Sequence, residues 1–176
     1  MTFRLLFVGD VVGSAGCSAV LDLVPKLREE LRLDAVVANA ENSAPGGSGI
    51  TKESSTALLS VVDFLTLGNH TFDAEGHEGF LEHEKRVVRP ANLDGYLPGR
   101  GWGVFEVEGV SVGVTNVLGQ VFVDRTSVSP FEVVDRAASE LEALGADLVL
   151  VDARAEATSE KQALGYHLAG RAQAVV

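Results

Sequence analysis

The 176-residue chain carries a formal net charge of −11 at pH 7, and 46% of its residues are hydrophobic. The negative charge disfavours binding to a long nucleic acid, although a small nucleotide stays compatible with it if bound metal ions supply positive charge. Cys17 is the single cysteine, which excludes an internal disulfide. Asp10 interrupts the first apolar run before a secretory signal could form, and no run is long enough to span a membrane. We therefore expect one α/β domain over residues 1–176, located in the cytoplasm and without a membrane partner.

The first half of the chain alternates between apolar strand patterns and one-sided helical patterns. Strands are predicted over residues 3–8, 34–39 and 63–67. Between the first two strands, apolar residues at steps of three and four predict an amphipathic helix that is kinked or restarts at Pro25. Thr51 can cap the helix that precedes the third strand. This alternation predicts a parallel sheet with right-handed crossovers.

The second half begins with two strand patterns, residues 101–108 and 110–117, which meet at Glu108-Gly109 and predict an antiparallel hairpin. The hairpin would either supply an antiparallel edge to the first sheet or begin a second sheet. Ser129-Pro130 predicts a helix start with a capping serine. The remaining predicted elements are a strand over residues 147–151, a helix over 159–169 and a short strand over 172–176.

Two segments have alternative interpretations. The glycine-rich loop Pro45–Gly49 lacks the Lys-Ser/Thr ending of a P-loop, so a plain turn or lid is favoured over phosphate binding. Arg89 precedes a proline, which favours extended backbone there. Its guanidinium could pair with an acid or contact a phosphate, and a structural role is the favoured interpretation.

Polar side chains follow three of the predicted strands. Asp10 follows the first strand, Glu41 and Asn42 follow the second, and Asn69 and His70 follow the third. Because the carboxyl ends of parallel strands meet at one edge of a sheet, where ligands bind, we expect these five side chains to line one rim. Each motif alone is common in ordinary turns, but their succession at three strand ends favours a site. Oxygen and imidazole donors together suit manganese, iron or zinc.

Seven stretches, spread over nearly the whole chain, match one known family in the family's own order. They are Phe7–Gly13, Ala40–Asn42, Gly47–Thr51, Leu67–Asp73, Arg89–Asn92, Pro98–Gly103 and Ala155–Lys161. On these stretches the chain resembles the calcineurin-like metallophosphoesterases, and among them the bacterial 2′,3′-cyclic-nucleotide 2′-phosphodiesterases. The resemblance implies a metallophosphoesterase-like α/β sandwich with a mostly parallel sheet and an antiparallel hairpin.

The same resemblance implies a dinuclear hydrolase with two metal ions, iron or manganese, with zinc as the alternative. Its substrate would be a 2′,3′-cyclic nucleotide or a similar small phosphodiester. By the family pattern Glu41 is the bridging carboxylate, Asp10, Asn42 and Asn69 are further ligands, and His70 donates the proton to the leaving oxygen. Imidazole suits that role because it gains and loses a proton near neutral pH.

The sequence departs from the family pattern in two places. The family has a ligand histidine directly before the Ala-Glu-Ala-Thr-Ser-Glu-Lys run, and here that position is Arg154. The family pattern also continues past Val176 into a Gly-Thr-His-Thr-His segment with two more ligands. From both departures we expect a domain that is incomplete at its C-terminus and an enzyme impaired by missing ligands. Asp152 is an alternative ligand, disfavoured because it lies deeper in its strand.

Three functional hypotheses follow. The first is a metal-dependent phosphodiesterase, the second a non-catalytic nucleotide-binding module, and the third a general metal-dependent phosphatase or nuclease. A nuclease would need a basic track, which a net charge of −11 disfavours. Metal content separates the first from the second, and turnover of cyclic nucleotides against monoesters separates the first from the third. A monomer and a homo-oligomer are equally compatible with the sequence.

Overall fold

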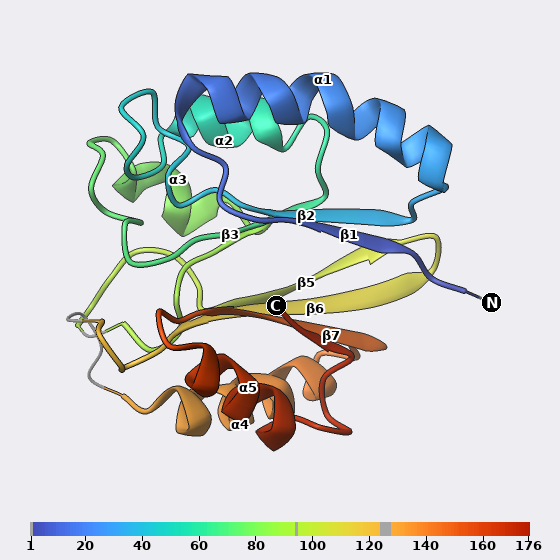
Figure 1. Ribbon diagram of the computed structural model, residues 1–176, viewed down its shortest axis with the longest axis vertical. Coiled ribbons are helices and arrows are strands. Elements are labelled where there is room, and N and C mark those ends of the chain that lie inside the picture. The colour runs from blue at the N-terminus through green and yellow to red at the C-terminus, as the bar shows by residue number, and fades with distance from the viewer. Residues whose placement is uncertain (1, 94, 124–127) are drawn as a thin grey trace.

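Two four-stranded sheets lie face to face in the computed structural model, which describes residues 2–93, 95–123 and 128–176 (Figure 1). The first sheet has the order β1-β2-β3-β4, and its neighbouring strands are all parallel, as predicted. Its strands are β1 (Leu5–Val8), β2 (Ala35–Asn39), β3 (Phe64–Thr66) and β4 (Val87–Val88). The sequence did not predict β4, because two residues are too few to establish an alternating pattern.

The second sheet has the order β5-β6-β7-β8. Its strands are β5 (Trp102–Val107), β6 (Val110–Leu118), β7 (Leu148–Arg154) and β8 (Ala174–Val175). The β5–β6 hairpin is antiparallel as predicted, while β7 and β8 continue the sheet in parallel, so the hairpin begins a second sheet. Strand β7 runs three residues past its predicted end at Val151, which makes Arg154 its last residue.

Helices cover the outer face of each sheet (Figure 1). The first sheet is covered by α1 (Gly13–Leu31), α2 (Lys52–Leu58) and α3 (Glu78–His83), and the second by α4 (Pro130–Ala143) and α5 (Thr158–His167). Helix α1 continues through Pro25, so the restart considered there does not occur.

The two predicted helix caps have different outcomes. The Oγ1 of Thr51 accepts a 3.2 Å hydrogen bond from the N–H of Ser54, and the Oγ of Ser54 accepts one of 3.1 Å from the N–H of Thr51. This reciprocal capping box confirms Thr51 as the cap of α2. Ser129 makes no capping hydrogen bond with its side chain, so that part of the prediction is wrong, although Pro130 begins α4 as expected.

An apolar layer fills the space between the sheets. Val37, Phe64 and Val88 of the first sheet pack against Val112 and Leu150 of the second. Burying one such side chain contributes about 1.5–3 kcal/mol. This layer holds the two sheets together and so fixes the position of the strand ends that carry the polar side chains.

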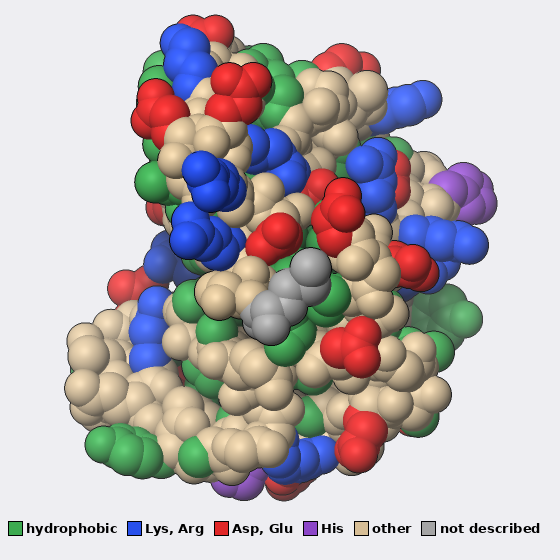
Figure 2. Space-filling view, turned by 90° about the vertical axis from the view of Figure 1, so that its right-hand side faces the viewer, with side chains coloured by type: hydrophobic (Ala, Val, Ile, Leu, Met, Phe, Trp, Pro, Cys, Tyr) green, Lys and Arg blue, Asp and Glu red, His purple; other side chains and the backbone are tan. Residues whose placement is uncertain are grey.

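The end of the molecule where the parallel strands begin carries interspersed acidic and basic side chains (Figure 2). A pocket of about 620 Å³ opens at this end, between the two sheets. It is lined in part by Phe3, Asp34 and Asp147, each of which lies just before a parallel strand. It lies at the opposite end from the predicted rim, which is at the carboxyl ends of the strands. None of the helices that the structure describes combines the length and apolar character needed to cross a bilayer.

Candidate active site

The loops that follow β1 and β2 are joined by backbone hydrogen bonds. The N–H of Val11 donates to the carbonyl of Asn39 at 2.9 Å, and the N–H of Gly13 donates to the carbonyl of Asn42 at 2.8 Å. The loops after the parallel strands of both sheets gather at the left edge of the molecule in Figure 1. The carboxyl ends of the strands therefore form one rim, as the sequence predicted.

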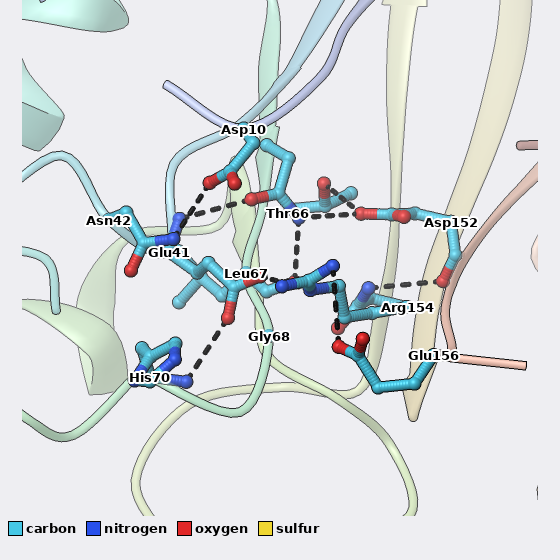
Figure 3. A network of polar contacts seen from close by, with 12 residues as sticks. Asp10, Glu41, Asn42, Thr66, Leu67, Gly68, His70, Asp152, Arg154 and Glu156 are labelled. Atoms are coloured by element: carbon cyan, nitrogen blue, oxygen red, sulfur yellow. Dashed lines mark hydrogen bonds and ion pairs between the residues drawn. The ribbon is translucent and has the colours of Figure 1, made fainter. Parts of the chain in front are cut away.

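Asp10 lies at this rim with a left-handed backbone, φ 42°. Its Oδ1 accepts a 2.7 Å hydrogen bond from the side-chain amide of Asn42 (Figure 3). Non-glycine residues are uncommon in this region of backbone space, although aspartate enters it more readily than most. Such a conformation costs of order 1–3 kcal/mol and tends to occur at functional sites. The turn at Asp10 therefore positions a solvent-exposed carboxylate against Asn42.

Glu41 is 1% exposed, and both of its carboxylate oxygens accept hydrogen bonds. Oε1 accepts from Nε of Arg154 at 2.8 Å, and Oε2 accepts from the backbone N–H of His70 at 3.1 Å. A Cβ at Gly68 would lie 2.1 Å from that same Oε2. The glycine of the Gly-Asn-His motif is therefore needed because the Glu41 carboxylate packs directly against its backbone.

His70 is held by two side chains that sequence analysis did not assign to the site. Its Nδ1 lies 2.6 Å from Oδ2 of Asp73 and 3.3 Å from the hydroxyl of Ser48. The Ser48 hydroxyl also donates to Asp73 at 2.8 Å. The spacing of three residues between His70 and Asp73 was a signal that could have identified this pair. With Nδ1 engaged, Nε2 is the ring atom left for a proton transfer.

Two hydrogen bonds link predicted rim residues in pairs. Asp10 contacts Asn42, and Glu41 contacts the backbone of His70. Asn69 directly precedes His70 in the same loop and is half-buried there.

Asp152 lies deeper, between the two sheets, and is 5% exposed. Its Oδ2 accepts hydrogen bonds from the hydroxyl of Thr66 at 2.6 Å and from the side-chain amide of Asn39 at 2.9 Å. Burial raises the pKa of Asp152, and the negative charge of Glu41 adds to this rise, while the two hydrogen bonds oppose it. This carboxylate joins the sheets beneath the rim, which agrees with the reason for disfavouring it as a ligand.

Arg154 ends β7 at the rim, and its side chain is 32% exposed. Its carbonyl accepts a 2.9 Å hydrogen bond from the N–H of Gly119, which fixes the backbone. Besides the contact with Glu41, one terminal nitrogen lies 3.9 Å from a carboxylate oxygen of Glu156. The expected ligand position is therefore occupied by a guanidinium bound to the predicted bridging carboxylate.

Arg89 has the structural role that its sequence context favoured. Its guanidinium donates to the backbone carbonyls of Pro90, Pro98 and Leu97 at 2.9, 3.1 and 3.4 Å. These contacts hold the loop that leads into β5.

A family model described as YmdB-like protein matches residues 6–176. The chain belongs to the YmdB-like protein family. The 2′,3′-cyclic-nucleotide 2′-phosphodiesterase of Bacillus subtilis strain 168 is 38% identical to it over 174 residues, a match that covers 98% of this chain and 65% of that protein.

Two crystal structures extend the similarity to the fold. A hypothetical protein from Thermus thermophilus superposes with a TM-score of 0.88 at 42% identity, covering 98% of this chain and 66% of its own. A phosphatase from Mycoplasma pneumoniae gives a TM-score of 0.86 at 31% identity, with 98% and 62% covered. The expected metallophosphoesterase-like α/β fold is thereby confirmed. The chain spans somewhat less than two thirds of the length of these proteins.

Oxygen atoms of the kinds that bind divalent cations lie at the rim, on Asp10 and Asn42. The exposed carboxylate of Asp10 lies against the buried amide of Asn42, which turns its nitrogen toward Asp10, and carboxylate and amide oxygens suit a hard cation. Each oxygen of Glu41 already accepts one N–H hydrogen bond, so an ion bridged by Glu41 would share these oxygens with Arg154 and with the backbone of His70. Over the residues that the structure describes, no three His, Cys, Asp or Glu side chains are grouped so as to hold a metal. The bridging role of Glu41 stays a prediction that requires Arg154 to move.

Proposed function

We propose that this protein is a metal-dependent phosphodiesterase that hydrolyses 2′,3′-cyclic nucleotides or similar small phosphodiesters. The proposal rests on one observation: a rim with a carboxylate–amide pair, Asp10 and Asn42, and a histidine–aspartate pair, His70 and Asp73. The 38% identity to a phosphodiesterase of that specificity supports the substrate class.

His70 is the proposed general acid. Water attacks phosphorus, the bond from phosphorus to the 2′ oxygen breaks, and Nε2 of His70 gives its proton to that oxygen, leaving a 3′-nucleotide. Asp73 accepts a hydrogen bond from Nδ1 and so orients the ring toward the leaving group. A divalent ion, iron or manganese with zinc as the alternative, would be held by Asp10, Asn42 and Asn69 and would activate the water and neutralise phosphoryl oxygens.

The test is a product analysis with the full natural chain. We expect 2′,3′-cyclic AMP to give 3′-AMP in the presence of Mn²⁺ or Fe²⁺, and chelation to abolish the reaction. Tight binding of the cyclic nucleotide without turnover under any of these metals would instead identify a binding module. Turnover of p-nitrophenyl phosphate alone would identify a phosphomonoesterase. Either of these results contradicts the proposal.

A further inference from the structure

The charge balance around Glu41 is the feature that the proposed function does not use. Glu41 is a carboxylate with 1% of its surface exposed, and such a group needs a nearby positive charge or several hydrogen bonds. In a two-metal hydrolase the positive charge at a shared carboxylate comes from the ions. Here it comes from Arg154, whose Nε–H donates to Oε1 at 2.8 Å (Figure 3).

We infer that the guanidinium of Arg154 replaces one of the two cations, so that this protein holds about one divalent ion per chain rather than two. A guanidinium stays protonated and offers no lone pair, so it cannot itself be a ligand. While Arg154 is bound to Glu41, a second ion would lie beside a fixed positive charge and would have to share Oε1 with the guanidinium. Because the inference concerns the same rim, it rests on the proposed metal-dependent function.

The surroundings of Arg154 favour this fixed arrangement. Its backbone lies at the end of β7, paired with Leu118 of β6, and its carbonyl accepts from Gly119 at 2.9 Å. The other carboxylate near its guanidinium, on Glu156, is 3.9 Å away and 54% exposed, so it is a weaker partner than Glu41. Displacing Arg154 from Glu41 would exchange a short buried contact for a solvated one. A metal ion would have to compensate for that exchange before it could bind to Oε1.

Metal stoichiometry tests the inference without reference to turnover. The full natural chain is freed of metal, incubated with excess Mn²⁺ and desalted, and Mn²⁺ per chain is measured by mass spectrometry. We expect about one ion in the parent and about one more in Arg154→His, whose imidazole can be a ligand. Arg154→Lys keeps the charge and should match the parent. Two ions in the parent, or equal content in the parent and Arg154→His, would overturn the inference.

A second measurement covers the case in which Arg154→His fails to fold. The electron paramagnetic resonance spectrum of the Mn²⁺-loaded parent distinguishes an isolated ion from a pair, since two ions a few ångströms apart are magnetically coupled. We expect the spectrum of an isolated ion. A coupled spectrum contradicts the inference even if cyclic nucleotides are hydrolysed. Absence of turnover with the expected stoichiometry contradicts the proposed function alone.

Discussion

Thr66 on β3 donates its hydroxyl to Asp152 on β7 at 2.6 Å, and this bond joins the two sheets directly beneath the rim. Asn39 on β2 donates to the same oxygen at 2.9 Å. The first sheet therefore contributes neutral donors, and the second contributes the acceptor. Since a buried polar group is costly unless it is paired, these contacts also fix how the sheets lie on one another.

The stability of the protein should depend on pH through Asp152. Burial raises the pKa of Asp152 in the folded state above its unfolded value, so the ionised carboxylate destabilises the fold. This loss of stability begins above the unfolded pKa, about 3.9, and grows until the pH passes the folded pKa. Asp152→Asn does not titrate, so its stability relative to the parent should increase as the pH rises above about 4. Urea unfolding over a series of pH values measures the difference, and a difference that shrinks with pH would contradict the prediction.

His70→Ala should lower turnover of a cyclic nucleotide by about 10²–10⁴-fold, the usual contribution of a general acid, with little loss of metal. The loss should be smaller for a diester with a p-nitrophenolate leaving group, which needs no proton. His167→Ala is the matched control, because His167 also pairs with an aspartate, Asp135 at 3.0 Å, but on the outer helices. Equal rates of His70→Ala and the parent on the cyclic nucleotide, whose leaving oxygen is a poor leaving group without a proton, would exclude His70 as the acid.

Gly68→Ala should destabilise the protein by about 3 kcal/mol, toward the upper end of overpacking costs, because the new Cβ would lie 2.1 Å from Oε2 of Glu41. Gly165→Ala is its control. That glycine lies within α5 with no atom near its missing Cβ, so alanine should stabilise the helix by about 0.5–1 kcal/mol. Chemical denaturation of both variants gives the two values, and a Gly68→Ala variant as stable as the parent would be inconsistent with this packing.

Asp10→Gly should be more stable than Asp10→Ala by about 1 kcal/mol, since φ at this position is 42° and glycine adopts left-handed backbone without a steric cost. Both variants lose the carboxylate, so both should bind Mn²⁺ more weakly than the parent. Comparing the two by thermal unfolding separates the backbone effect from the lost contact with Asn42. Equal stability of the pair would mean that the loop relaxes around alanine.

The sequence was sufficient to predict the parallel sheet whose strand ends carry Asp10, Glu41 and Asn69, but not the partners of the buried Glu41 carboxylate. Apolar runs predicted β1, β2 and β3. Because these strands are parallel, the polar residues that follow them were expected at the same edge of the sheet. The contact between Glu41 and Arg154 spans 113 residues and depends on how two sheets pack, which no local pattern encodes. The end of β7 was also hidden, because Asp152 and Arg154 interrupt its apolar run although the strand continues through them.

The separation of 113 residues between Glu41 and Arg154 has a consequence during synthesis of the chain. A chain emerges from the ribosome with its N-terminal part first, so β1, β2 and β3 are available long before β7. Until β7 arrives, the inner face of the first sheet can pack only against the β5–β6 hairpin, through residues such as Val112, and Glu41 lacks its counter-ion. The apolar layer is therefore completed at the same point at which that carboxylate is neutralised. A nascent chain stalled before β7 would carry the Glu41 carboxylate without its counter-ion, on a sheet whose apolar layer still lacks Leu150.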